Sequence, residues 1–301
     1  MSSSRQLMKV VLIVNPYASA VSEARVRAVE RELGRVAQVR TVLTERPGHG
    51  IELASAADGD ALLVLSGDGG FNEVLNGARA GIPLAFLPGG GANVLSRALG
   101  LPRDPAAAAR QVGEALEAGR TRTISVGRVN GRRFSFSAGL GFDSELVRRV
   151  DARGRRDDGK RPGDGAFITA ALALVAERRL RFEPVLEVGG LGRAAFALVA
   201  NTDPYTYAGA IPVHVAPEAR FELGLDLFAP KQVTAATLPR LLRHLVTGKG
   251  VRDREVVHGH DLDRIEITCD RPLPLQVDGE DLGDVEHAVF EAERGAIAVL
   301  V

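Results

Sequence analysis

A glycine-rich turn at residues 66–70 (SGDGG) limits the folds open to this chain more than any other segment. It follows the apolar run 61–65 and precedes the helix-compatible pattern 71–77, so a strand passes through the turn into a helix. Such a turn leaves backbone N–H groups at the positive end of a helix dipole, and its glycines let a phosphate come close. The turn predicts a nucleotide phosphate site. A tight strand-to-helix turn with Asp68 as the N-cap is the alternative that this motif alone leaves open.

A second glycine-rich loop, at residues 88–93 (PGGGAN), follows the apolar run 83–87. A third loop, at residues 15–19, follows the apolar run 10–14. Loops that leave the carboxyl ends of neighbouring parallel strands meet in one crevice, so we expect the three loops to form one site. Asp68 would repel a bare phosphate there, unless a Mg²⁺ ion or a reacting hydroxyl stands between them. This pattern indicates phosphoryl transfer.

The chain divides into two parts with different patterns of apolar and turn residues. Residues 1–127 alternate short β-like and helix-like runs, which predicts an α/β nucleotide-binding domain with a parallel sheet. Residues 128–287 are rich in short strands and turn signals, including the hairpin turn Asn130-Gly131, which predicts a mostly antiparallel β-sandwich. The segment 151–165 has almost no apolar residue and predicts a loop.

Charge and hydropathy exclude several classes of partner and location. The chain has 38 Lys and Arg against 38 Asp and Glu, so no global field favours nucleic acid, and any attraction to a membrane must be local. The longest uncharged apolar stretch, 166–176, is shorter than the roughly 18 residues of a membrane-spanning helix. Residues 1–5 lack the apolar core of a signal peptide, so we expect a cytoplasmic protein. The single cysteine, Cys269, is expected to pack rather than react.

Six segments, in this order, resemble the diacylglycerol kinase catalytic family, which includes bacterial lipid kinases and sphingosine kinases. They are 15–16 (NP), 44–49 (TERPGH), 67–77 (GDGGFNEVLNG), 88–102 (PGGGANVLSRALGLP), 134–146 (FSFSAGLGFDSEL) and 277–280 (VDGE). The resemblance implies ATP and Mg²⁺ as cofactors and a lipid hydroxyl as the acceptor, reached at the membrane surface. It also implies a two-domain fold in which residues 288–301 complete the first domain and the active cleft lies between the domains.

The loops and the resemblance together predict the residues that hold the nucleotide. They are Asn15, Pro16, Thr44, Ser66, Gly67, Asp68, Gly69, Gly70, Asn72, Glu73, Gly90, Gly91 and Asn93. The chain has no GxxxxGK[ST] sequence, so Mg²⁺ must be held by carboxylates and by ATP itself, and Asp68 is the predicted metal ligand. Glu73 is either a second carboxylate for the metal or a structural residue of the helix.

The segment Val277-Asp278-Gly279-Glu280 alone would be an ordinary turn. The family places a DGE sequence at the cleft and gives it the proton-accepting role. The resemblance therefore makes Asp278 the predicted base, with Glu280 close behind, and Asp68 completes the predicted catalytic set. The loop 201–209 resembles the family's loop facing the lipid, although a turn with packed tyrosines would give the same pattern.

The sequence also departs from the family's usual pattern. Gly70 and Gly91 stand where the family usually has threonine, and Val94 stands where it usually has an acidic residue. Leu223 interrupts an acidic pair that in some members holds a structural Mg²⁺, so we do not expect that metal site at 222–226. A soluble-substrate kinase of the NAD kinase type and a non-catalytic binding protein therefore stay open as alternatives. A homodimer that pairs the sheets of the second domain is also conceivable.

Overall fold

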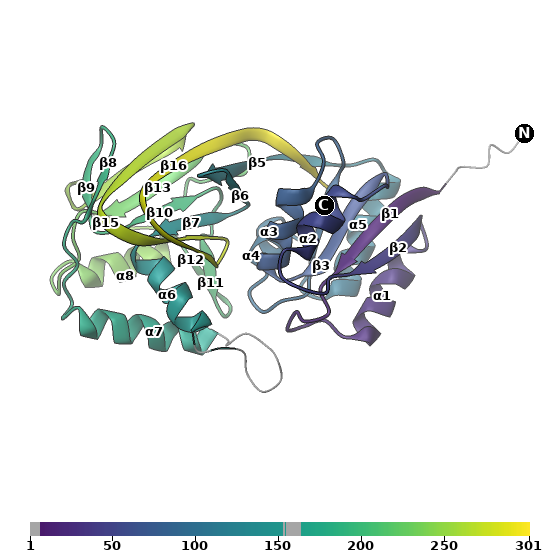
Figure 1. The fold of residues 1–301 in the computed structure, drawn as a ribbon, viewed down its shortest axis with the longest axis horizontal. Helices are drawn as coiled ribbons and strands as arrows, with labels where there is room; N and C mark the ends of the chain where they lie inside the picture. Colours follow the sequence, from purple (N-terminus) through teal and green to yellow (C-terminus); the bar gives the residue numbers. More distant parts are fainter. Residues whose placement is uncertain (1–6, 153, 155–163) are drawn as a thin grey trace, which may run out of the picture. The chain divides into compact units, whose positions relative to one another are not determined.

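The computed structural model describes residues 7–152, 154 and 164–301, so most of the predicted loop at 151–165 lies outside the described residues. The chain forms two compact units (Figure 1). Unit 1 contains the residues up to Ile124 together with Gly295–Val301, and unit 2 contains Ser125–Arg294.

Unit 1 is built on a parallel sheet with the strand order β4-β3-β1-β2, and Val299 at the end of β16 pairs in parallel with Leu84 of β4. The strands are β1 (Met8–Val14), β2 (Ala37–Leu43), β3 (Ala61–Ser66), β4 (Leu84–Pro88) and β16 (Glu280–Val299). The helices are α1 (Glu23–Leu33), α2 (His49–Ser55), α3 (Asp68–Gly77), α4 (Val94–Ala98) and α5 (Pro105–Glu117). The predicted α/β domain with a parallel sheet is confirmed.

The central strands of unit 1 are apolar along their whole length because helices cover both faces of a parallel sheet. Every residue of β3 and of β4 is buried. Polar groups in these strands would lose their water, so the sequence can carry chemistry only where the strands end. Each strand end is followed by one of the predicted loops.

Unit 2 is built on an antiparallel sheet with the strand order β14-β13-β10-β7-β15-β16. Besides β16, the strands of this unit are β5 (Arg122–Val129), β6 (Arg132–Phe134), β7 (Ser137–Leu140), β8 (Leu186–Val188), β9 (Gly192–Ala194), β10 (Ala197–Ala200), β11 (Thr206–Ala208), β12 (Ile211–Val213), β13 (Leu225–Pro230), β14 (Val256–Leu262) and β15 (Arg264–Val277). The hairpin β5-β6 turns at Asn130 and Gly131, which both have positive φ, as the sequence predicts. The predicted β-rich second domain is confirmed.

Three helices accompany the strands of unit 2: α6 (Phe142–Asp151), α7 (Asp164–Glu177) and α8 (Leu238–Thr247). One apolar cluster fills the unit around Phe134, Phe290 and the inner residues of β7, β10 and β15. Cys269 belongs to this cluster, and burial raises the pKa of its thiol to about 11, which confirms packing as its role. A second cluster, around Phe196 and Phe228, is covered by α8.

Within the described ranges of the chain, no helix is long and apolar enough to cross a membrane.

Candidate functional site

Three loops of unit 1 leave the carboxyl ends of β1, β3 and β4, and backbone hydrogen bonds join them. The N–H of Asn15 donates to the carbonyl of Leu65 (3.1 Å), and the N–H of Ala20 donates to the carbonyl of Gly89 (2.8 Å). The N–H of Gly89 in turn donates to the carbonyl of Ser66 (2.7 Å). The convergence of the loops that the sequence predicts is therefore present.

Glycines permit this close approach of the loops. A methyl group on Gly90 would lie 2.6 Å from the Cα of Gly67, which is backbone and cannot turn aside. A methyl group on Gly70 would lie 2.1 Å from the Oγ of Ser66. Both positions therefore exclude any side chain, and the two glycine loops touch through their backbones.

Helix α3 begins at Asp68 with Gly67 as its N-cap, and no side chain caps it. The N-cap is therefore Gly67 and not Asp68, while the tight strand-to-helix turn itself is present. The N–H groups of an uncapped first turn suit an anion, and the helix dipole adds to their attraction. The Oγ of Ser66 lies beside this turn, is buried, and has no hydrogen-bond partner within the described part of the chain. A buried polar atom without a partner is costly, so it is a place where a ligand would restore a hydrogen bond.

The carboxylate of Asp68 lies across from the next loop, since the N–H of Leu95 donates to its Oδ1 (3.3 Å). Asn93, at the start of α4, has a positive φ of 48°. Its Oδ1 accepts from the N–H of Gly90 and its Nδ2 donates to the carbonyl of Gly90, both at 2.8 Å. Asn93 thus fixes the shape of the 88–93 loop.

Glu73 has a structural task that the sequence analysis did not specify. Its Oε1 accepts from the N–H of Gly48 and its Oε2 from the N–H of Gly50, both at 2.8 Å. These N–H groups stand at the start of α2, so the carboxylate supplies the cap that the sequence of α2 lacks. A contact of Glu73 with ATP or metal stays a prediction.

Two further predicted residues are held within unit 1. Asn72 is fully buried, and its backbone O and its Oδ1 accept from the Nδ2 of Asn76 (2.9 and 3.1 Å). Thr44 is nearly buried, and its N–H donates to the carbonyl of Val14 (2.9 Å). The contacts of Asn72 and Thr44 with ATP likewise stay predictions.

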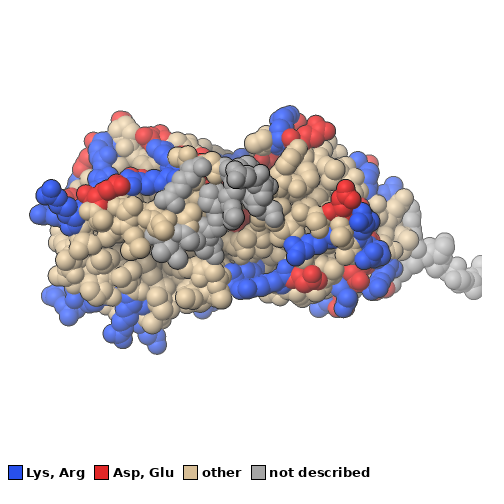
Figure 2. Space-filling model, turned by 90° about the horizontal axis from the view of Figure 1, so that it is seen from below, with Lys and Arg blue, Asp and Glu red and all other residues tan. Residues whose placement is uncertain are grey.

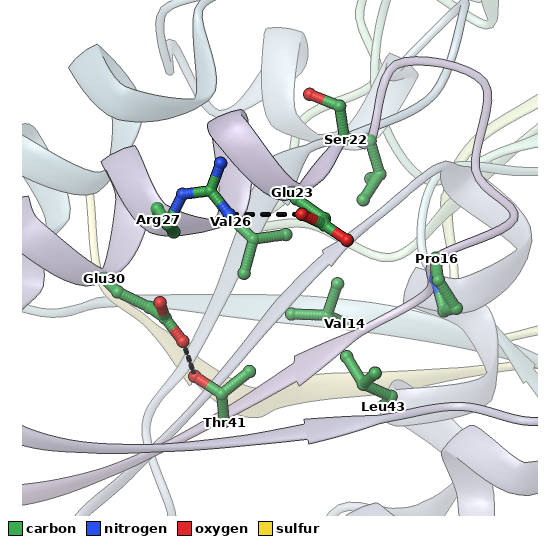
Figure 3. Close-up of a pocket in the computed structure, with 10 residues that line it drawn as sticks. Val14, Pro16, Ser22, Glu23, Val26, Arg27, Glu30, Thr41 and Leu43 are labelled. Atoms are coloured by element: carbon green, nitrogen blue, oxygen red, sulfur yellow. Dashed lines mark hydrogen bonds and ion pairs between the residues drawn. The ribbon is translucent and has the colours of Figure 1, made fainter.

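A pocket of about 410 Å³ lies beside the first of these loops (Figure 3). Figure 3 shows an apolar floor, and two polar pairs at the side of α1: Arg27 with Glu23 (3.2 Å), and the hydroxyl of Thr41 donating to Glu30 (2.5 Å). The lining residues are Val14, Pro16, Val21, Ser22, Glu23, Val26, Arg27, Glu30, Thr41 and Leu43. Its volume falls within the range of small-molecule sites. Apart from Pro16, the sequence analysis missed these residues, because in a sequence they look like ordinary strand and helix positions.

In unit 2, the predicted base Asp278 stands in the tight turn between β15 and β16, with a positive φ of 48° followed by Gly279 at 82°. The Asp278 side chain is 2% exposed. Its Oδ2 accepts from the N–H (2.7 Å) and the hydroxyl (2.9 Å) of Ser135, and its Oδ1 accepts from the N–H of Phe136 (3.0 Å) and of Ser137 (3.2 Å). Both carboxylate oxygens are thus engaged in holding the β6-β7 junction against the turn.

Glu280 follows at the start of β16 and is placed differently. Its side chain is 35% exposed, and its Oε2 lies 3.6 Å from a guanidinium nitrogen of Arg132. The half-buried Glu280 carboxylate is more accessible to a substrate hydroxyl than the Asp278 carboxylate, which would first have to give up buried hydrogen bonds.

A buried polar network supports this turn from behind. The Oε1 of Gln276 accepts from the N–H of Gly279 (2.8 Å), and its Nε2 donates to Oδ2 of Asp143 (2.8 Å). The hydroxyl of Tyr205 donates to the same oxygen (2.6 Å). Burial raises the pKa of Asp143, although the hydrogen bonds from Tyr205 and Gln276 oppose the rise. The sequence analysis missed Asp143 and Gln276 as site residues, although Asp143 lies within the quoted segment 134–146 and Gln276 directly precedes the segment 277–280.

Models of known protein families match both units of the chain. The family model "Diacylglycerol kinase catalytic domain" matches residues 9–129, and the model "YegS C-terminal NAD kinase beta sandwich-like domain" matches residues 137–301, more than half of the chain. The chain belongs to the diacylglycerol kinase family. Curated relatives of the chain are named probable lipid kinase and diacylglycerol kinase, and membership of the family supports an enzyme of the lipid kinase type.

One relative matches along nearly the whole of this diacylglycerol kinase family chain. It is named "Probable lipid kinase YegS-like" in Pseudomonas fluorescens, is 30% identical, and the match covers 97% of this chain and 94% of the relative. Against several other curated relatives, the chain spans only about half of their length, between 52% and 55%.

Solved structures show the same fold. A diacylglycerol kinase from Bacillus anthracis is similar with a TM-score of 0.68 at 21% identity, over 97% of this chain and 96% of that one. An NAD kinase from Archaeoglobus fulgidus in complex with ATP is similar with a TM-score of 0.53 at 13% identity, over 97% of this chain and 93% of that one.

The stretch around Asp226, where we expect no structural metal, is held by hydrogen bonds and ion pairs. Asp226 is buried, and it accepts from the N–H of Asp261 (3.0 Å) and lies 2.9 Å from the Nδ1 of His260. The N–H of Gly224 donates to Oδ1 of Asp261 (2.7 Å), which also pairs with Arg294 (2.7 Å). Among the residues that the structure describes, no group of three or more His, Cys, Asp or Glu side chains could hold a metal ion.

Proposed function

We propose that this protein is an ATP-dependent lipid kinase that transfers the γ-phosphate to a hydroxyl of diacylglycerol or a related lipid alcohol. The observation that carries the proposal is the start of α3. No side chain caps it, and the glycine loop that leads into it is in backbone contact with the second glycine loop. An anion-binding helix terminus with Asp68 at its first position suits a phosphate chain that arrives with a cation. The family supplies the acceptor class, because a relative matched over almost the full chain is named a lipid kinase.

The glycines, Ser66 and the pocket beside Pro16 each have a role in this proposal. The glycines let backbone N–H groups approach the phosphates, and the Oγ of Ser66 can donate its unused hydrogen bond to a phosphate oxygen. Backbone N–H groups can replace the usual threonine hydroxyls, since each neutral hydrogen bond contributes only about 1 kcal/mol net. The apolar pocket beside Pro16 is suited to a nucleoside base.

Mg²⁺ fits this arrangement as an ion shared with the nucleotide. The described residues form no all-protein cage for a metal, but Mg²⁺ is commonly bound by one or two carboxylates together with substrate phosphates. Asp68 is the residue that would hold it. When bound, the ion would neutralise charge on the phosphates during transfer.

For the proton of the lipid hydroxyl, we assign the accepting role to Glu280. Asp278 then holds the turn in shape through its four hydrogen bonds, and Gln276 fixes Gly279 between the two carboxylates. The base must reach the hydroxyl that it deprotonates, and Glu280 is the more accessible of the two carboxylates.

The experiment follows labelled γ-phosphate from Mg·ATP into a lipid extract in mixed micelles, with NAD offered in a parallel reaction. Asp68→Asn is the test variant, and Asp58→Asn, which changes an exposed carboxylate of the same unit, is the matched control. Label in lipid that is lost only in Asp68→Asn supports the proposal, and chromatography then identifies the acceptor.

Two other outcomes would select an alternative. Label in NAD would show a kinase of the NAD kinase type, whose fold this chain shares. ATP binding without transfer to either acceptor would show a non-catalytic binding protein.

A further inference from the structure

Helix α8 of unit 2 has one wide apolar stripe, of which only part is covered. Leu238, Leu241 and Leu245 pack on the second apolar cluster, and the ring of His244 stacks on Phe228 with centroids 4.8 Å apart. The other part of the stripe points away from this cluster. It carries Leu242, which is 53% exposed, and Val246, which is 59% exposed. A helix that only covers a core would carry polar residues at these positions.

Helix α7 shows the same departure. Ala170 and Leu174 are its buried positions. The outward positions are Thr169, Leu172, Ala173 and Ala176, and Leu172 is 66% exposed. No charged residue occurs from 165 to 176, so this outward face is apolar for about three turns.

A third exposed apolar side chain is Ile211, 57% exposed, in the strand β12 that contacts α8. Figure 1 draws α7, α8 and β12 on the same side of unit 2, the lower side in that view. We call Leu172, Ile211, Leu242 and Val246 the apolar patch. Several large apolar side chains exposed on one side of one unit indicate an interaction surface rather than scattered surface residues.

Basic residues outnumber acidic ones beside the apolar patch, although Glu177, Glu183 and Glu255 in the flanking segments each pair with an arginine. Residues 238–252 contain Arg240, Arg243, Lys249 and Arg252 and no Asp or Glu. Just after α7, residues 178–181 add three more arginines. Arg179, Arg243 and Lys249 are exposed and form no ion pair with the residues that the structure describes. Figure 2, which views this side, shows a broad surface of uncharged residues with Lys and Arg at its edge.

We propose that the apolar patch docks unit 2 on an anionic lipid bilayer. Apolar side chains that enter the interface, together with Lys and Arg that stay at the headgroup level, are the pattern of peripheral helices on anionic membranes. The chain's balanced net charge does not oppose this, because the excess of basic residues is local.

A second copy of the chain fits this surface less well. A two-fold pairing through the apolar patch would bring Arg243 and Lys249 near the same residues of the other copy, and like charges at an interface are unfavourable. In the proposed function, the lipid substrate would come from this bilayer. Binding to the bilayer itself needs neither ATP nor turnover.

The test is flotation of the full chain, without ATP, with vesicles of phosphatidylcholine alone and of phosphatidylcholine with phosphatidylglycerol. We expect binding to the anionic vesicles, and a loss of about tenfold or more in the vesicle affinity of Leu242→Asp and of Leu172→Asp. Leu191→Asp is the matched control, because Leu191 is a 49% exposed leucine of unit 2 in the turn between β8 and β9. It should bind as the wild type does.

The proposal is overturned if the wild type does not float with anionic vesicles, or if Leu191→Asp loses as much binding as Leu242→Asp. It is also overturned if Leu242→Asp abolishes a dimer seen without lipid. Thermal unfolding of each variant shows that the fold is kept. Phosphate transfer to detergent-dispersed diacylglycerol, measured on the same samples, separates the two proposals: a protein that binds vesicles but transfers no phosphate refutes only the kinase function.

Discussion

Replacing the two carboxylates of the turn between β15 and β16 should have opposite effects on stability and activity. Asp278→Ala removes the acceptor of four hydrogen bonds, three of them from backbone N–H groups. Each buried donor left without a partner costs about 1–3 kcal/mol, so even if water satisfies two of them the variant loses about 2–6 kcal/mol. For a unit of this size, that loss lowers the unfolding temperature by about 5–20 °C.

Glu280→Gln should leave stability nearly unchanged. The side chain is 35% exposed and its ion pair with Arg132 is long, at 3.6 Å, so the loss of this pair changes stability by about 1 kcal/mol or less. If Glu280 accepts the substrate proton, phosphate transfer falls by about 10²–10⁴-fold. Glu286→Gln, an exposed carboxylate on the same strand, is the control and should change neither quantity.

The measurements are calorimetric unfolding and the rate of phosphate transfer on the same preparations. An Asp278→Ala variant that unfolds at the wild-type temperature would refute the structural role of Asp278. A fully active Glu280→Gln variant, together with a well-folded and inactive Asp278→Asn variant, would return the role of base to Asp278.

Three further predictions concern the fold around the loops. Gly90→Ala places a methyl group 2.6 Å from the Cα of Gly67 and should cost about 1–3 kcal/mol in urea unfolding, whereas Gly91→Ala, which meets nothing within 4 Å, should cost far less; equal costs would contradict the close contact of the loops. Glu73→Ala removes the acceptor for two N–H groups at the start of α2 and should cost about 1–2 kcal/mol, against no change for the exposed Glu45→Ala. The hydrogen bond with Asp226 raises the pKa of His260, so this stabilisation is complete below about pH 6.5 and is lost as the pH rises through the raised value. The unfolding free energy of the wild type should therefore fall relative to that of His260→Gln as the pH rises from 6 upward, and parallel curves would contradict the pairing.

The parts of the site that the sequence predicts are those whose cause is local. A glycine turn between an apolar strand and a helix is written in a dozen consecutive residues, so the loops after β1, β3 and β4 could be located without the structure. Their convergence follows from strand order, which the alternation of strands and helices indicates.

The parts that the sequence does not show depend on distant partners. Glu73 caps a helix that begins 24 residues earlier, and a glutamate in a helix gives no sign of this. The network behind the DGE turn joins Asp143 to Tyr205 across 62 residues and to Gln276 across 133. Likewise, the exposure of Leu242 depends on how much of the apolar stripe of α8 the rest of unit 2 covers. The sequence of α8 alone does not specify this.

The central claim is that the glycine loops and Asp68 of unit 1 transfer the γ-phosphate of ATP to a lipid hydroxyl. The most direct measurement is the formation of phosphatidic acid from diacylglycerol and Mg·ATP by the wild type, Asp68→Asn and the control Asp58→Asn. The account predicts product with the wild type and with Asp58→Asn, and a loss of about a hundredfold or more with Asp68→Asn. Lipid phosphorylation at the wild-type rate in Asp68→Asn, or none in a wild type that binds ATP, would contradict it.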